Sequence, residues 1–263
     1  MIRMTYVTIT YNAADVLQRT LDSVLSQDYP EIVHLIIDGA STDTTLQLVD
    51  AYIQQSNASE NGHRVQVISE PDKGIYDAMN KGLRSLDGDY VCFLNAGDFL
   101  PSKDTVSRIV NAISDSSLYT PHSSLPAVLY GDTDIVDSEG RFLYHRRLAP
   151  PEHLTWKSFK QGMLVCHQAF YARTDFAIAT PYDMQYRYSA DVDWCIRVMK
   201  AADKERVPLL NLKMVVANYM EEGQTTQHHR ESLWERYHVM ERHYGRVQTF
   251  LLHAWFAVRS LFK

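Results

Sequence analysis

Residues 4–25 read MTYVTITYNAADVLQRTLDSVL and join a short run of β-branched residues to a segment with helical periodicity. The run from Met4 to Thr10 predicts a buried strand. Apolar residues then recur on one helical face between Val16 and Leu25, which predicts an amphipathic helix with Asn12 as its N-cap. This stretch therefore predicts a strand followed by a helix.

The same alternation continues over about the first 110 residues. Predicted strands at 32–37, 65–68 and 90–94 alternate with predicted helices at 46–53 and 75–86. Successive strands joined by helices run parallel and are covered on both faces. We therefore predict an α/β fold with a doubly wound, mostly parallel sheet.

The pattern changes beyond Pro121, where short strands follow one another without helices between them. The residues Asp-Ser-Glu-Gly at 137–140 indicate a hairpin turn, so the sheet of the second half is predicted to be mixed. The predicted elements are strands at 128–130, 133–136 and 141–145 and helices at 190–202 and 231–244.

Composition excludes several classes of protein. The chain has 263 residues, 45% of them hydrophobic, and a formal charge of −6, which argues against nucleic acid as a partner. Its three cysteines, Cys92, Cys166 and Cys195, form no ligand-spaced pair and indicate a reducing, cytoplasmic compartment. Polar residues interrupt the N-terminal segment, and no run of 18 apolar residues occurs, so we expect neither a signal peptide nor a membrane span.

Polar side chains follow each of the first four predicted strands. In parallel sheets, ligands bind beyond the carboxyl ends of the strands. Each of these residues alone also fits a turn or a cap, as Asp38 does in DGASTD. Their joint placement at one edge of the sheet predicts a binding site made of Tyr11, Asn12, Asp38, Glu70, Asp72, Asn95 and Asp98.

The sequence contains neither a GxGxxG motif after the first strand nor a P-loop. A phosphorylated ligand would then need another source of positive charge. A divalent cation, Mg²⁺ or Mn²⁺, held by one or two carboxylates can neutralise a diphosphate. We predict Asp98 as the metal ligand.

Six segments in order resemble the family 2 glycosyltransferases, which have the GT-A fold. SEPDKGIYDAMNKG and FLNAGD resemble in particular the bacterial branch that assembles exopolysaccharide, O-antigen and colanic-acid-type polymers. The matching segments are VTITYN (7–12), IIDGASTDTT (36–45), SEPDKGIYDAMNKG (69–82), GDYVCFLNAGD (88–98), HQAF (167–170) and SADVDWCIR (189–197).

The resemblance implies a division of the chain. Residues 1–120 would form the half that binds a nucleotide-diphosphosugar, and residues 121–245 would form the acceptor-binding half of the same domain. Residues 246–263 would form a C-terminal amphipathic helix.

The resemblance also implies roles for the donor site. Asn12, Asp38 and Asp72 would lie beside the base and ribose of the donor, and Tyr11 and Lys81 are assigned to donor binding with them. Asn95 and Asp98 occupy the family's metal and ribose motif. Many members have Asp-Ala-Asp-Asp where this chain has Asn-Ala-Gly-Asp at 95–98. The central carboxylate is absent, so metal binding depends on Asp98. His228 or His229 is either a further metal ligand or a solvent-facing residue.

Asp191 falls where the family keeps its general base, at the start of a helix. A carboxylate there can take the proton of an attacking hydroxyl. Asp193 is the rival candidate, and an acid in a first helical turn is also favoured by the exposed backbone N–H groups.

Two further kinds of residue are candidates for donor binding. His167 could contact donor phosphate or acceptor, or could be a structural histidine. Arg187, with Arg146 and Arg147, could form bidentate bonds to a diphosphate, or could be an ordinary surface charge.

The last predicted helix combines Trp255, Phe256 and Phe262 with Arg259 and Lys263. Such a segment could lie in a membrane interface, which suits a lipid-linked acceptor, or it could pack on the core or on a second subunit of a homo-oligomer.

The predicted function is an inverting, metal-dependent glycosyltransferase at the inner face of the membrane, acting on a glycan or a lipid-linked saccharide. A sugar-nucleotidyltransferase and an inactive nucleotide-sugar-binding protein are the alternatives. The nucleotidyltransferase is disfavoured because TYNAADVLQRT, which follows the first strand, lacks the glycine-rich loop of that class. The inactive binding protein is supported by Gly97, which stands where many members of the family have a carboxylate. The motifs do not distinguish donor bases or sugars.

Overall fold

The computed structural model describes residues 1–116, 125–221 and 229–260. The predicted boundary at 120/121, the residue His228 and the end of the predicted C-terminal helix lie outside these residues. The side chain of His229 is also not described.

The first half alternates strands and helices as predicted. Strand β1 pairs in parallel with β2 and β4, and β2 pairs in parallel with β3. The doubly wound parallel sheet is therefore confirmed. Its elements are β1 (Met4–Thr10), α1 (Ala14–Leu25), β2 (Ile32–Asp38), α2 (Thr45–Ser59), β3 (Arg64–Ser69), α3 (Ile75–Arg84), β4 (Tyr90–Phe93) and α4 (Thr105–Asp115).

The second half extends the same sheet. Strand β7 runs antiparallel to β4 and to β5, and β5 pairs with β6 antiparallel and with β8 parallel. One eight-stranded mixed sheet results. The further elements are β5 (Val128–Val136), β6 (Phe142–His145), η1 (Trp156–Gln161), η2 (His167–Ala169), β7 (Phe170–Arg173), α5 (Thr174–Ala179), α6 (Ala190–Glu205), β8 (Leu209–Met220), α8 (His229–Tyr244) and α9 (Arg246–Ser260).

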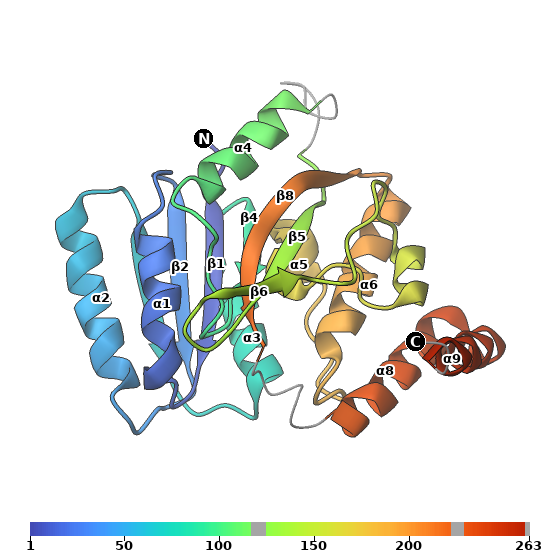
Figure 1. Ribbon diagram of the computed structural model, residues 1–263. Helices are drawn as coiled ribbons and strands as arrows, with labels where there is room; N and C mark the ends of the chain where they lie inside the picture. The colour runs from blue at the N-terminus through green and yellow to red at the C-terminus, as the bar shows by residue number, and fades with distance from the viewer. Residues whose placement is uncertain (117–124, 222–228, 261–263) are drawn as a thin grey trace.

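Alternation along the buried strand β2 explains the layers around the sheet. Ile36 packs with Leu17 and Leu21 of α1, whereas Ile37 belongs to the larger core on the other face, with Met79 of α3. Successive strand residues point to opposite faces, so one strand serves two cores. Figure 1 shows α1 and α2 beside each other at one side of the sheet and α6, α8 and α9 at the other end.

Asn12 is not the N-cap of α1, which corrects the prediction. Ala13 occupies that position, and Asn12 has φ of +47°. Its side-chain Oδ1 instead accepts a hydrogen bond from the backbone N–H of Thr42, at 2.8 Å. Asparagine tolerates this left-handed conformation better than most residues, so Asn12 ties the loop after β1 to the loop after β2.

The second half also differs in detail from its predicted elements. Residues 128–130 and 133–136 belong to one strand, β5, and the long strand β8 was not predicted. The pairing of β5 with β8 shifts register around Asp132, and Lys213 in β8 has φ of +53°. These irregularities break the alternation that marks a strand in sequence.

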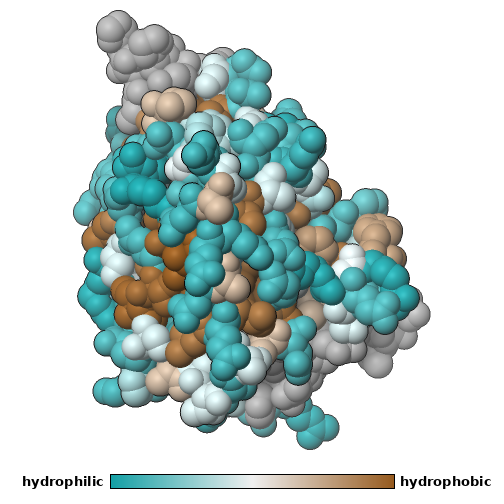
Figure 2. Space-filling view, turned by 90° about the vertical axis from the view of Figure 1, so that its left-hand side faces the viewer, coloured by the Kyte–Doolittle hydropathy of each residue, from teal (hydrophilic) through white to brown (hydrophobic). Residues whose placement is uncertain are grey.

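Strand β3 forms an edge of the sheet, with Val65 and Val67 half-buried. Figure 2 views the molecule from the α2 side, and hydrophobic residues gather in the middle of that face between hydrophilic ones. Among the described helices, none combines the length and the hydropathy needed to cross a bilayer.

Candidate active site

A cavity of about 940 Å³ opens where the carboxyl ends of β1, β4 and β8 meet the starts of α3 and α6. It brings together residues from both halves of the chain. Seven of the predicted site residues line it: Tyr11, Asp72, Asn95, Asp98, His167, Arg187 and Asp191. Asp191 therefore shares one hollow with Asp72 and Asp98.

Three predicted residues, Asn12, Asp38 and Lys81, are not among the residues that line the cavity. Lys81 donates to the carbonyl of Pro71 at 2.7 Å and pairs with Glu70 at 3.0 Å, so it holds the loop that carries Asp72. The assignment of these three residues to donor binding remains a prediction.

The carboxylate of Asp38 is fully buried and bonded within the loops around it. It accepts hydrogen bonds from the backbone N–H of Ser41 at 2.9 Å and from the hydroxyl of Ser69 at 2.7 Å. A methyl group added at neighbouring Gly39 would lie 2.5 Å from Asp72 Oδ2, so the side chain of Asp72 would have to move to make room for it.

Asp98 is a buried carboxylate fixed from two sides. Its Oδ1 accepts the backbone N–H of Met220 at 3.0 Å, and its Oδ2 accepts the side-chain N–H of Gln168 at 2.7 Å. Burial raises the pKa of Asp98 to about 6, although both hydrogen bonds lower it. A nearby cation would favour the charged form of this group.

His167 connects the two sides of the cavity. Its Nε2 accepts from the side-chain N–H of Asn95 at 3.1 Å, and its Nδ1 lies 3.3 Å from Asp191 Oδ2. This arrangement requires the tautomer with the proton on Nδ1. Sequence left open whether His167 contacts a ligand or is structural, and the structure shows that it both lines the cavity and bonds to Asp191.

Asp191 lies in the first turn of α6, and 16% of its side chain is exposed. Its Oδ1 accepts a hydrogen bond from the hydroxyl of Tyr76 at 3.2 Å. Burial acts to raise the pKa of Asp191, but the hydrogen bond from His167 and the charge of Arg236 outweigh it and hold the pKa below its usual value. Asp191 is therefore ionised at neutral pH and can accept a proton.

Asp193, the rival base, does not line the cavity. Its side chain is fully buried and pairs with Arg197 at 2.5 Å and with His243 of α8 at 2.8 Å. These contacts fasten α6 to α8. The geometry therefore favours Asp191 as the base.

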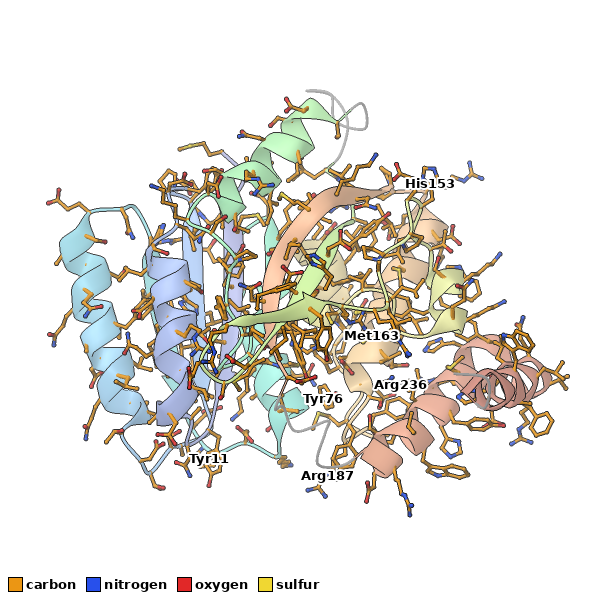
Figure 3. All side chains as sticks on the ribbon, viewed as in Figure 1. Tyr11, Tyr76, His153, Met163, Arg187 and Arg236 are labelled. Carbon is orange, nitrogen blue, oxygen red and sulfur yellow. The ribbon has the colours of Figure 1, made fainter. Side chains whose placement is uncertain are left out.

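The three candidate arginines differ in their surroundings. Arg187 lines the cavity, and its guanidinium lies 5.5 Å from the ring centre of Tyr188. Arg146 instead donates to the carbonyls of Met163 and Leu148, at 2.6 Å each, and Arg147 is exposed. Of the three, Arg187 alone lines the cavity. In Figure 3, Arg187, Tyr11 and Tyr76 are all labelled in the lower half of the view, with Tyr76 further inside, and His153 lies in the upper half.

The sequence also named Gln168, beside His167, as a candidate contact to donor phosphate or acceptor, and Gln168 lines the cavity and bonds to Asp98. Among the residues that sequence reasoning missed is Tyr76, which lines the cavity, bonds to Asp191 and lies inside a segment already quoted for the resemblance. Tyr219 was missed as well, because it belongs to β8, which the sequence did not reveal.

Comparison with known proteins identifies the family. Residues 5–177 match the sequence model described as "Glycosyl transferase family 2". The chain belongs to this family. A relative in Mycobacterium tuberculosis (strain ATCC 25618 / H37Rv), the PGL/p-HBAD biosynthesis glycosyltransferase Rv2957, is 32% identical over 219 residues, which cover 81% of this chain and 75% of the relative. The predicted family is therefore confirmed.

Solved structures of similar fold support the GT-A architecture. S. aureus TarS 1-349 in complex with UDP-GlcNAc matches 91% of this chain with a TM-score of 0.67 and 18% identity. The mannosyltransferase PcManGT from Pyrobaculum calidifontis, in complex with GDP-Man and Mn²⁺, matches 92% with a TM-score of 0.61 and 17% identity. This chain spans 65% of the former structure and 64% of the latter.

Proposed function

We propose that this family 2 member is an inverting glycosyltransferase that moves a sugar from a nucleotide-diphosphosugar to a hydroxyl of a saccharide acceptor. One observation carries the proposal: Asp191, ionised and held by two donors, faces the same cavity as Asp98 and Asp72. A cavity of about 940 Å³ is also large enough for a nucleotide sugar.

The chemistry assigned to Asp191 is general-base catalysis. Its carboxylate accepts the proton of the acceptor hydroxyl while that oxygen attacks the anomeric carbon and the bond to the diphosphate breaks. Attack from the face opposite the leaving group inverts the anomeric centre. Positioned bases of this kind contribute about 10²- to 10⁴-fold to the rate.

The residues around Asp98 fit a divalent cation, Mg²⁺ or Mn²⁺. The side-chain Oδ1 of Asn95 is buried and has no hydrogen-bond partner among the described residues, and carboxylate and amide oxygens are ligands of hard cations. We propose that Asp98 and Asn95 hold the ion. When bound, it would neutralise the diphosphate of the donor.

The ligand set from this chain is small. Within residues 1–116, 125–221 and 229–260, no group of three or more His, Cys, Asp or Glu side chains is arranged so that it could hold a metal ion by itself. Magnesium in phosphate-binding sites commonly takes one or two carboxylates, with phosphate oxygens and water completing its shell. Asp98 with Asn95 is consistent with that pattern, and the absence of a second carboxylate at Gly97 suits a weakly held ion.

We further propose that the acceptor is a glycan or a lipid-linked saccharide of a bacterial surface polysaccharide, made at the cytoplasmic face of the membrane. The three cysteines are free thiols, as in a reducing compartment. The name of the mycobacterial relative refers to PGL/p-HBAD biosynthesis. Exposed aromatic side chains on α9, including Phe250 and Trp255, support contact with a membrane surface.

A donor panel tests the proposed function. The purified chain would be incubated with UDP-, GDP- and TDP-sugars, with and without Mn²⁺, and with saccharide acceptors, and nucleoside diphosphate release and product anomericity would be measured. We expect release of nucleoside diphosphate from one donor class, stimulated by Mn²⁺ and accompanied by inverted product. The variant Asp98→Ala should lose the stimulation by Mn²⁺.

Other outcomes would overturn the proposal. Release of pyrophosphate from a nucleoside triphosphate would indicate a nucleotidyltransferase. Donor binding without turnover on any acceptor would indicate a binding protein, and a retained anomeric configuration would contradict direct displacement. The variant Asp50→Ala, which changes an exposed carboxylate on α2, is the matched control for Asp98→Ala.

A further inference from the structure

The carboxylate of Asp191 receives hydrogen bonds from two different parts of the chain. Tyr76, in the first turn of α3, donates its hydroxyl to Oδ1 at 3.2 Å. His167 of η2 approaches Oδ2 with Nδ1 at 3.3 Å. Each oxygen of the carboxylate is thus held by its own donor.

The ring of Tyr76 is itself held by a stack of aromatic side chains. Tyr182 stacks on Tyr76 with ring centres 5.6 Å apart, and Trp194 stacks on Tyr182 at 5.0 Å. Trp194 lies three positions after Asp191 on α6. The contacts therefore form a closed circuit: helix α6 carries both Trp194 and Asp191, and the stacked side chains of Tyr182 and Tyr76 connect the two.

Asn80 fixes the middle of this stack. Its side-chain N–H donates to the carbonyl of Tyr182 at 3.0 Å, and its Oδ1 accepts the backbone N–H of Tyr182 at 2.8 Å. Asn80 lies one helical turn after Tyr76 on α3. The segment GIYDAMN thus supplies both Tyr76, which donates to Asp191, and Asn80, which holds Tyr182 against Tyr76.

We propose that Tyr76 and His167 are positioning residues for the general base, which fix the orientation of the Asp191 carboxylate toward the acceptor. This inference rests on the proposed function. A carboxylate in a first helical turn can otherwise rotate about its side-chain bonds, and small displacements of a catalytic group can cost about 10²-fold in rate. Hydrogen bonds to an ionised group are also the stronger kind.

The same two donors stabilise the ionised form of Asp191. The hydrogen bond from His167 is among the causes that lower the pKa of Asp191, and a hydroxyl that donates to a carboxylate acts in the same direction. Loss of either donor should therefore raise the pKa of Asp191 and move the acidic limb of the pH–rate profile to higher pH. The titratable and charged groups that face Asp191 are Tyr76 from α3, His167 and Cys166 at η2, Tyr182 before α6, Cys195 on α6, Tyr219 from β8 and Arg236 from α8.

Paired tyrosine variants test the role of Tyr76. Tyr76→Phe removes the hydroxyl that bonds to Asp191, whereas Tyr182→Phe removes a buried hydroxyl that has no partner among the described residues, in the same stack. We expect Tyr76→Phe to lower kcat about 10- to 100-fold and to leave donor affinity by calorimetry unchanged. The acidic limb of its pH–rate profile should move to higher pH. Tyr182→Phe should leave all three quantities near wild type.

Two histidine variants give an independent reading. Asn at position 167 places an amide N–H near the position of Nδ1, whereas Leu supplies no donor. We therefore expect His167→Asn to retain more kcat than His167→Leu, with the acidic limb displaced only in the latter. Equal loss in both would contradict the role assigned to Nδ1.

The outcomes separate this inference from the proposed function. If Asp191→Asn loses turnover while Tyr76→Phe and Tyr182→Phe behave alike, the positioning role is wrong and the base assignment stands. If Tyr76→Phe changes only the affinity for donor, the positioning role is also wrong. If Asp191→Asn keeps wild-type turnover, the base assignment itself fails.

Discussion

Asp191 and Asp193 are two positions apart on α6 and have opposite surroundings. Asp191 faces the cavity, whereas Asp193 is completely buried against Arg197 and His243. Sequence named both as acids in a first helical turn, which is correct for both. Spacing on a helix does not reveal which acid meets a partner such as His243, 50 positions further along the chain, so the structure was needed to separate the two acids.

Asparagine substitution at these two positions should separate chemistry from stability. Asp191→Asn keeps the size of the side chain but cannot accept a proton, so we expect kcat to fall at least about 10²-fold with donor affinity nearly intact. Steady-state kinetics and calorimetry measure the two quantities. Unchanged turnover would reject the role of Asp191.

The matched variant Asp193→Asn should behave in the opposite way. It leaves the guanidinium of Arg197 without its buried charged partner, which typically costs about 3–5 kcal/mol of folding free energy. Urea unfolding should therefore show a large loss of stability, while turnover per folded molecule stays close to wild type.

Predictability from sequence also varied among single polar residues. Asp98 was assigned to the cavity from the end of its strand alone, and the structure places it there. Asp38 also follows a strand, yet its carboxylate turns to Ser41 and Ser69 instead of lining the cavity. A strand end fixes where a side chain begins, but the local competition for backbone and hydroxyl donors decides where it points.

At the scale of elements, regular buried strands were the most predictable. The bounds of β1 are those read from sequence, because its β-branched run is continuous and buried. Strand β8 was missed because register shifts and Lys213 interrupt it. That omission matters, since β8 supplies Tyr219 to the cavity and the backbone N–H of Met220 to Asp98.

Helix α8 acts on the site by capping another helix. The carboxylate of Glu235 accepts the backbone N–H groups of Arg187, Tyr188 and Ser189, at 2.6–3.0 Å. These residues lead into α6 just before Asp191. Because the partners are 46 to 48 positions apart in sequence, no local motif could indicate this contact.

Loss of this cap should weaken both stability and catalysis. We expect Glu235→Ala to lower the free energy of unfolding by about 1–2 kcal/mol, the scale of a lost helix cap, and to lower kcat because the turn that carries Asp191 loosens. Urea unfolding and kinetics would measure these effects. Glu231→Ala, an exposed change on the same helix, is the control, and equal behaviour of the two variants would contradict the capping role.

At the scale of the whole molecule, α9 presents an exposed apolar face. Val247, Phe250, Leu251 and Trp255 are each at least 60% exposed, and the side chain of Arg246 beside them is 88% exposed. Sequence predicted an amphipathic C-terminal helix but left open whether it meets a membrane or a second subunit. Amphipathic helices with aromatic and basic residues bind anionic lipid surfaces.

Vesicle binding tests whether the exposed apolar face of α9 contacts a membrane or a second copy of the chain. We expect the protein to sediment with vesicles that contain anionic lipid and not with neutral ones, and Phe250→Asp with Leu251→Asp should abolish sedimentation without changing turnover on a soluble acceptor. Light scattering provides the competing outcome. A doubled mass in solution that the same substitutions reduce to a monomer would assign this face to a second copy and reject membrane contact.

The match to the family ends at residue 177, whereas the helix with Asp191 begins at Ala190 and Met220 lies further on. This has a practical meaning for anyone who builds hybrid enzymes from two relatives in order to transplant a donor preference. A crossover at the end of the match would take Tyr76 from one parent and Asp191 from the other, and it would separate Asp98 from the strand whose backbone N–H at Met220 it accepts. Such hybrids should therefore be assembled with these interacting segments inherited together.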